Sequence, residues 1–196
     1  NTGVSRVLLG GLIDNPYGTT SVTSGGDIDF TTDAGKKIRT TRLDLDAGLS
    51  SHVGQADAPV RVEATLLDVS AGSDIHVNQV SGNMVLLRAD APAGLVSLTA
   101  AGSILDSGVA AQGIHGARIS LAALQGSLGR SDNWLDVDGT DLAQPASLDA
   151  SAETGIFLAS GVLAPTIRGL SIGRVVATAG GVAIRVADED TVGGQD

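Results

Sequence analysis

The 196-residue chain has a net charge of −10 and no cysteine, so disulfides, thiolate metal sites and cysteine nucleophiles are excluded. Ten of its twelve basic residues are arginines scattered along the sequence, and without a basic cluster the chain lacks the surface that binds nucleic acid. No apolar run reaches the about 18 residues of a membrane span, so we expect a protein that is not membrane-embedded.

The composition also limits how the interior is built. Hydrophobic residues make up 42% of the chain but aromatic residues only 2%, and there are 27 glycines. Aliphatic side chains must therefore fill nearly all of the core of what the length predicts to be one domain. The lack of cysteine fits either a reducing compartment or a secreted protein that crosses a membrane unfolded.

The first 21 residues hold a short apolar run, Val7 to Ile13, followed by the turn-forming sequence Asp14 to Gly18. We expect a turn at that sequence and assign residues 1–21 to the end of a preceding coil or to a cap. Because the N-terminus shows neither an initiator methionine nor a signal sequence, we expect the chain to be a segment of a longer protein.

From Val22 onward one pattern recurs: two or three alternating apolar residues, a small residue, a glycine and a second alternating pair. In the stretch from Leu67 to Val77 every second residue is apolar on each side of the bend, which is typical of two strands joined by a tight corner. We expect the glycine to adopt a positive φ there.

The glycines of this pattern recur every 23 to 30 residues, with a mean of 26. Strand patterns at such a period predict an all-β fold, a parallel β-helix (β-solenoid) of about seven to eight coils of ~26 residues. The aligned glycines are Gly25, Gly48, Gly72, Gly102, Gly126, Gly155 and Gly181.

A longer repeat groups the coils in threes. The stretch from Val53 to Val62 recurs 75 residues later as Leu128 to Val137, and three coils of about 26 residues span the same distance. We therefore divide one continuous solenoid domain into a first block at 22–97, a second block at 98–177, and the start of a third block with a frayed end at 178–196. Asp141 to Ala146 is predicted to be an inserted surface loop in the second block.

Three phrases of these blocks resemble a known class of sequences: the two repeated stretches, the pair Leu66 to Ala71 and Ala146 to Ser151, and the phrase Leu98 to Asp106. They are similar to the repetitive β-helical regions of large bacterial surface exoproteins, the filamentous-haemagglutinin-like adhesins and related autotransporter passengers. The resemblance covers most of residues 22–186. It implies a right-handed helix of parallel strands, export across an outer membrane, and a role in adhesion or as a spacer.

Pairs of aspartates two positions apart could bind a hard cation or act as an acid–base dyad, because both carboxylates project from one face of a strand. We expect most of them to form the solvent face instead. The calcium-binding nonapeptide is absent, so we predict no cofactor and keep calcium as an alternative. The pairs are Asp27 with Asp29, Asp44 with Asp46, and Asp136 with Asp138.

Four further residues each follow a glycine of the pattern by four positions and would form an outward column on successive coils: Asp29, His52, His76 and Asp106. The chain has only three histidines, and a register error of one residue would scatter the column. We therefore expect neither a metal site nor a catalytic site. No Gly-x-Ser-x-Gly elbow sits on a strand-to-helix turn and no phosphate-binding loop is present, which excludes nucleophilic and phosphoryl-transfer chemistry of those kinds.

The repeated stretches differ where a ligand would be contacted: Pro59 in the first copy is replaced by Trp134 in the second, and Arg61 by Asp136. An indole at a corner can stack on a sugar or on another protein. We predict Trp134, Asp136, Asp138 and Asp141 as binding residues.

Together with the predicted solenoid, the resemblance implies a non-enzymatic stalk or adhesion segment of a large secreted or cell-surface bacterial protein. Its partners would be a host or neighbouring-cell surface protein or glycan and the rest of its own chain. One alternative is a carbohydrate-active β-helix enzyme, a polysaccharide lyase or hydrolase, which requires acidic and basic residues that converge in a cleft. Another is a calcium-stiffened extender of a repeat adhesin.

Overall fold

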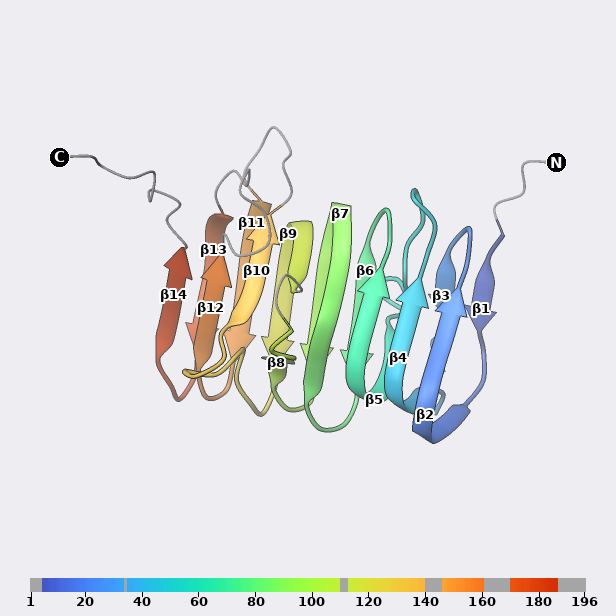
Figure 1. Ribbon diagram of the computed structural model, residues 1–196, viewed down its shortest axis with the longest axis horizontal. Coiled ribbons are helices and arrows are strands. Elements are labelled where there is room, and N and C mark those ends of the chain that lie inside the picture. Colours follow the sequence, from blue (N-terminus) through green and yellow to red (C-terminus); the bar gives the residue numbers. More distant parts are fainter. Residues whose placement is uncertain (1–4, 34, 110–112, 140–145, 161–169, 187–196) are drawn as a thin grey trace.

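The computed structural model describes residues 5–33, 35–109, 113–139, 146–160 and 170–186. All regular structure in these residues is β, and every strand pairing is parallel. The coils stack in chain order along the long axis, from β1 at one end to β14 at the other (Figure 1), and strands of successive coils pair, such as β1 with β3, β2 with β4 and β12 with β14. They are β1 (Val7–Leu9), β2 (Ile13–Thr23), β3 (Ile28–Phe30), β4 (Ile38–Asp46), β5 (Val60–Ser70), β6 (Ile75–Gln79), β7 (Met84–Ala100), β8 (Ile104–Asp106), β9 (Ile114–Ala123), β10 (Leu135–Gly139), β11 (Ala146–Ala152), β12 (Ile156–Ser160), β13 (Leu170–Ala177) and β14 (Val182–Val186).

The predicted parallel β-solenoid is confirmed, with about seven turns. The turns vary in length more than the glycine spacing indicates, because residues in register along one column lie 17 positions apart between Val62 and Gln79 and 29 apart between Ala123 and Ala152. That column runs through Ile13, Ile38, Val62, Gln79, Ala100, Ala123, Ala152 and Ala177. Within the described part of the chain no helix is long and apolar enough to cross a membrane.

The core forms because alternate residues of each strand face the interior. In β5 the buried side chains are those of Val60, Val62, Ala64, Leu67 and Val69, each at most 5% exposed, whereas the other residues of the strand are partly or fully exposed. Each aliphatic side chain packs on its counterpart in the next coil. At about 1.5–3 kcal/mol for each fully buried side chain, this column of contacts is the main stabilising contribution.

The expected role of the pattern glycines is wrong. None of the described ones adopts a positive φ; the glycines that do are Gly54, Gly82, Gly108 and Gly129. At Gly48, Gly72, Gly102 and Gly126 glycine is required instead by the close approach of the neighbouring coil, whereas a Cβ on Gly25 or Gly181 would meet nothing within 4 Å. A Cβ on Gly72 would lie 1.7 Å from the carbonyl oxygen of Leu49, and one on Gly48 would lie 2.2 Å from that of Gly25.

The turn predicted at Asp14 to Gly18 is also wrong, because these residues lie within β2. Asn15 and Thr19 pair with Thr40 and Arg42, so four steps along β2 match two steps along β4. The additional residues form a bulge that projects from the sheet and leaves Tyr17 96% exposed. A bulge accommodates the proline because its missing N–H is not needed by the ladder.

The two repeated stretches fold in the same way. Gly54 and Gly129 have φ of 68° and 66°, and their N–H groups donate to the carbonyls of Ile28 and Ile104 at 2.7 and 2.8 Å. A four-residue turn follows in each copy, closed by reciprocal backbone hydrogen bonds between its first and last residues. We name these the first turn, residues 55–58, and the second turn, residues 130–133. The predicted inserted loop lies outside the described residues, except that Ala146 begins β11.

Candidate functional site

The second turn forms one wall of a pocket of about 350 Å³. Asp106 lies at the end of β8, Asp132 in the second turn, Asp136 in β10 and Arg185 in β14, and Trp134 joins the turn to β10. Residues almost 80 positions apart in the sequence thus meet because the stack places β8, β10 and β14 close together. We name this cavity the Trp134 pocket.

Trp134 is fixed on several sides. Its indole N–H donates to the carbonyl of Ser131 at 3.1 Å, and its ring meets that of Phe157 edge to face with centroids 6.0 Å apart. The guanidinium carbon of Arg185 lies 4.6 Å from the centre of the indole ring, which is the arrangement of a cation–π contact. Trp134 therefore presents a rigid aromatic wall.

Asp106 is the most buried carboxylate of the pocket, at 9% exposure. Its Oδ1 accepts a hydrogen bond from the Gly108 N–H, but its Oδ2 is buried without a hydrogen-bond partner. The side-chain amide of Asn133 donates to the Asp106 carbonyl at 3.1 Å and ties the second turn to β8. A buried carboxylate oxygen without a donor is costly, so this atom marks a place where a donor is missing.

Two carboxyl groups of this pocket have a raised pKa. Burial, followed by the charges of Asp106 and Asp138, raises the pKa of Asp136 to about 6, and Arg185 only partly opposes this shift. Burial also raises the pKa of Asp106, against the hydrogen bond from Gly108. Desolvation and like charges are the ordinary causes of such shifts, and at Asp136 the charges of Asp106 and Asp138 oppose the single nearby cation, Arg185.

Asp138 lies next to the pocket rather than in its wall. It is fully buried and accepts a hydrogen bond from the Ser160 hydroxyl at 3.3 Å. On the neighbouring strand, in register with Asp138, is His115. The pKa of His115 is raised, first by its hydrogen bond to Asp90 at 3.0 Å, with burial opposing and the charge of Asp138 contributing.

Of the predicted binding residues, the structure brings Trp134 and Asp136 into one pocket and places Asp138 beside them, while Asp141 lies outside the described residues. Asp106 and Arg185 were missed as members of this site. The sequence held a partial signal for Asp106, its position four residues after a pattern glycine. Nothing in the sequence connects Arg185 to Trp134.

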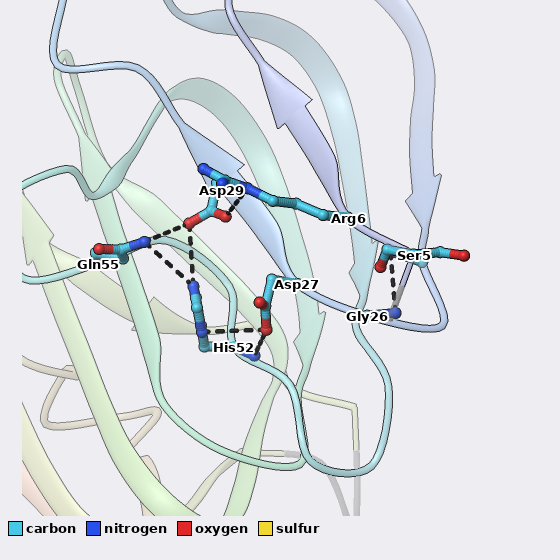
Figure 2. Close-up of polar contacts among 8 residues, drawn as sticks. Ser5, Arg6, Gly26, Asp27, Asp29, His52 and Gln55 are labelled. Carbon is cyan, nitrogen blue, oxygen red and sulfur yellow. Dashed lines mark hydrogen bonds and ion pairs between the residues drawn. The ribbon is translucent and has the colours of Figure 1, made fainter. Parts of the chain in front are cut away.

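A second polar cluster lies near the N-terminal end of the stack (Figure 2). The His52 ring lies between two carboxylates, with Nδ1 3.2 Å from Asp27 and Nε2 3.0 Å from Asp29. Asp29 also pairs with Arg6 at 2.5 Å and accepts from Gln55 of the first turn at 2.6 Å. Among the described residues this is the one group of acidic and histidine side chains close enough together to share a metal ion.

The cluster is better explained by its internal contacts than by a metal. Burial alone would raise the pKa of Asp29, but hydrogen bonds from His52 and Gln55 and the charge of Arg6 outweigh it and hold the pKa below its ordinary value. The carboxylate thus already has three donors, and an ion would have to displace Arg6. Calcium prefers six to eight oxygen ligands, and a histidine and an arginine do not supply them.

The outward column predicted from the glycine spacing does not form. Val53 pairs with Ile28 and with Ile75, so His52 lies in line with Asp27 rather than with Asp29. Asp106 pairs with Leu86 and belongs to a different part of the stack. The expectation that the paired aspartates face solvent is likewise wrong for Asp29, at 3% exposure, and for Asp138.

Comparisons with protein-family models, with curated proteins and with solved structures found no match to this chain. The described residues form a parallel β-solenoid with an acidic, tryptophan-walled pocket.

Asp136→Asn is expected to stabilise the protein at pH 7.5 and to leave its stability unchanged near pH 4. Because the folded-state pKa is raised from 3.8 to about 6, the stability that this carboxyl contributes is fully present below pH 3.8 and is lost as the pH rises through about 6. The full shift corresponds to about 3 kcal/mol, which solvent screening at this half-buried site reduces to about 1–2 kcal/mol. Urea unfolding at several pH values measures the difference.

Asp57→Asn is the matched control, since Asp57 is exposed in the first turn and its loss reports the general effect of removing one negative charge. If Asp136→Asn gained the same stability at pH 4 as at pH 7.5, the gain would not come from removing an ionised carboxylate at position 136.

Proposed function

We propose that this chain is a non-enzymatic stalk or adhesion segment of a longer protein that is secreted or held at a bacterial cell surface. The observation that carries the proposal is the self-pairing of outward charges between coils. Asp68 of β5 lies 3.6 Å from Arg42 of β4 and 2.9 Å from Arg88 of β7. Lys37, just before β4, pairs with Glu63 of β5 at 2.6 Å.

Surface charges that pair with one another between coils suit a stalk better than an enzyme, whose charged groups must converge on a substrate. Each exposed pair stabilises little, about 0–1 kcal/mol, but together the pairs favour one register of neighbouring coils. The secreted location rests on the resemblance to exported adhesins, and the lack of cysteine is consistent with it.

A specific observation favours the carbohydrate-active alternative as a second candidate. The Trp134 pocket combines an aromatic wall with two carboxyl groups, Asp106 and Asp136, whose pKa values are raised. Glycosidases pair a carboxyl group of raised pKa with a second carboxylate. An enzyme of this kind would lose activity as Asp136 changes ionisation near pH 6.

Turnover assays on neutral, acidic and amino polysaccharides separate the two functions. We expect neither reducing-end release nor unsaturated-product absorbance above the level of the Asp136→Asn variant between pH 5 and pH 8. Product formation that Asp136→Asn abolishes and the exposed-site variant Asp57→Asn retains would overturn the stalk proposal in favour of an enzyme.

A further inference from the structure

The Trp134 pocket is an addition to the scaffold rather than a requirement of it. The shared hydrogen bonds of the repeated stretches make Ile28 equivalent to Ile104, so Phe30 is the counterpart of Asp106. By the same alignment Pro59 and Arg61 are the counterparts of Trp134 and Asp136. The first copy therefore builds the same turn with no carboxylate at either position, and the coil does not need the pocket's acidic groups in order to fold.

The pocket lacks a donor and has excess negative charge. Asp106, Asp132 and Asp136 line it, against one cation, Arg185. Asp106 is nine-tenths buried and its Oδ2 has no hydrogen-bond partner. A group that completes this site must donate hydrogen bonds and carry positive charge, because a neutral donor would leave the repulsion between carboxylates in place.

Arg185 shows which cation fits. Its guanidinium lies over the indole of Trp134, and its charge acts on Asp136. A planar guanidinium can stack on an aromatic face while it donates to carboxylates. The side chain of Arg185 itself is exposed, so it reaches the pocket from the surface.

A bare metal ion fits less well. Among the described residues, the acidic and histidine groups whose ligand atoms lie within 4.8 Å of one another are those of the Asp27, Asp29 and His52 cluster, which is elsewhere. The carboxylates of the Trp134 pocket are thus spread around a cavity of about 350 Å³. Such a volume suits the end of a long side chain with several donors.

We propose that the Trp134 pocket binds a basic side chain, an arginine in preference to a lysine, of a protein partner. The chain's net charge of −10 would favour the approach of a basic partner. Trp134 supplies the stacking face, and Asp106 and Asp136 accept hydrogen bonds from the guanidinium. Arg185 occupies part of the site in the free protein and is displaced. The proposal rests on the adhesion role proposed above and gives it a ligand chemistry.

The probes are N-acetyl-arginine methylamide, the lysine and norleucine counterparts, and an arginine-containing pentapeptide. Trp134 is the only tryptophan of the chain, so its fluorescence reports on the pocket directly, and calorimetry serves the variants that lack it. We expect the arginine probes to bind more tightly than the lysine probe and the norleucine probe to show no binding. Affinity should fall about tenfold from pH 7.5 to pH 5 as Asp136 is protonated.

The variants give opposite expected effects. Trp134→Ala, Asp106→Asn and Asp136→Asn should each weaken arginine binding at least about tenfold, while Asp57→Asn in the first turn leaves it unchanged. Arg185→Ala should strengthen binding several-fold, because it removes the internal competitor. Melting curves confirm that each variant is folded.

Three results would overturn the proposal: no fluorescence change with the arginine probes, weaker binding in Arg185→Ala, or tight binding of chitosan oligomers with none of the peptide. The second result would mean that Arg185 supports binding instead of competing with the ligand, and the third that the partner is an amino sugar. None of them bears on the stalk proposal, which the polysaccharide turnover assay tests separately.

Discussion

Gly72→Ala is expected to destabilise the solenoid by about 3–5 kcal/mol. A Cβ at this position would lie 1.7 Å from the carbonyl oxygen and 1.9 Å from the carbonyl carbon of Leu49. Both are backbone atoms of the neighbouring coil, so no side chain can move aside. The coil must shift instead, and the hydrogen bonds from Gly72 N–H to Gly48 and from Ser73 N–H to Ser51, at 3.2 and 2.9 Å, would lengthen or break.

Gly25→Ala is the matched control. Gly25 occupies the same position in the sequence pattern, but a Cβ there has no heavy atom within 4 Å, and its φ does not require glycine. The change in its free energy of unfolding should stay within about 0.5 kcal/mol. Urea unfolding followed by circular dichroism measures both variants, and equal destabilisation would contradict the assigned role of inter-coil approach.

The contrast between these two glycines shows how far the sequence predicts the fold. Alternation of apolar residues and a regular glycine interval were sufficient to predict parallel strands in a solenoid, because both are properties of a single coil. They could not separate Gly72 from Gly25, because the distinction depends on which backbone atom of another coil lies above the Cα. We expected glycine at position 72 because of its own backbone conformation, whereas the structure requires it because of a contact with the neighbouring coil.

The candidate site was predictable in part for the same reason. Trp134 and Asp136 stood out because a repeat makes substitutions visible: each replaces a different residue of the first copy. Asp106 and Arg185 join them only through stacking, and the spacing of residues along the chain does not determine that register. The burial of Asp29 was missed because two of its hydrogen-bond partners, His52 and Gln55, come from the next coil.

Gln79→Leu is expected to lower the free energy of unfolding by about 3–5 kcal/mol, although it places an apolar residue inside the solenoid. Gln79 is 4% exposed, and its in-register neighbours, Val62 and Ala100, are apolar. Its Oε1 accepts from the Ala64 N–H at 3.1 Å. Its Nε2 donates to the carbonyls of Ala64, Ser81 and Asn83 at 3.0, 2.8 and 3.2 Å.

The expected loss follows from those four contacts. Leucine has a similar volume and leaves no large cavity, so the cost is that of backbone groups deprived of their partner, about 1–3 kcal/mol for each one that stays buried and unsatisfied. The side chain of Gln79 thus pairs with the backbone of Ala64 in place of a strand-to-strand hydrogen bond. This occurs at the shortest turn of the column, 17 residues, where β6 pairs with β5. A pattern that only sorts residues into apolar and polar would favour leucine here.

Gln125→Leu separates the two effects, because Gln125 is exposed and its replacement should change stability by no more than about 0.5 kcal/mol. Hydrogen exchange should also show faster exchange of the Ala64 amide in Gln79→Leu, since that N–H loses its acceptor. If Gln79→Leu unfolds at the same urea concentration as the wild type, the Ala64 groups have found other partners and the bridging role of Gln79 is wrong. A stability loss without faster exchange at Ala64 would place the damage in side-chain packing instead.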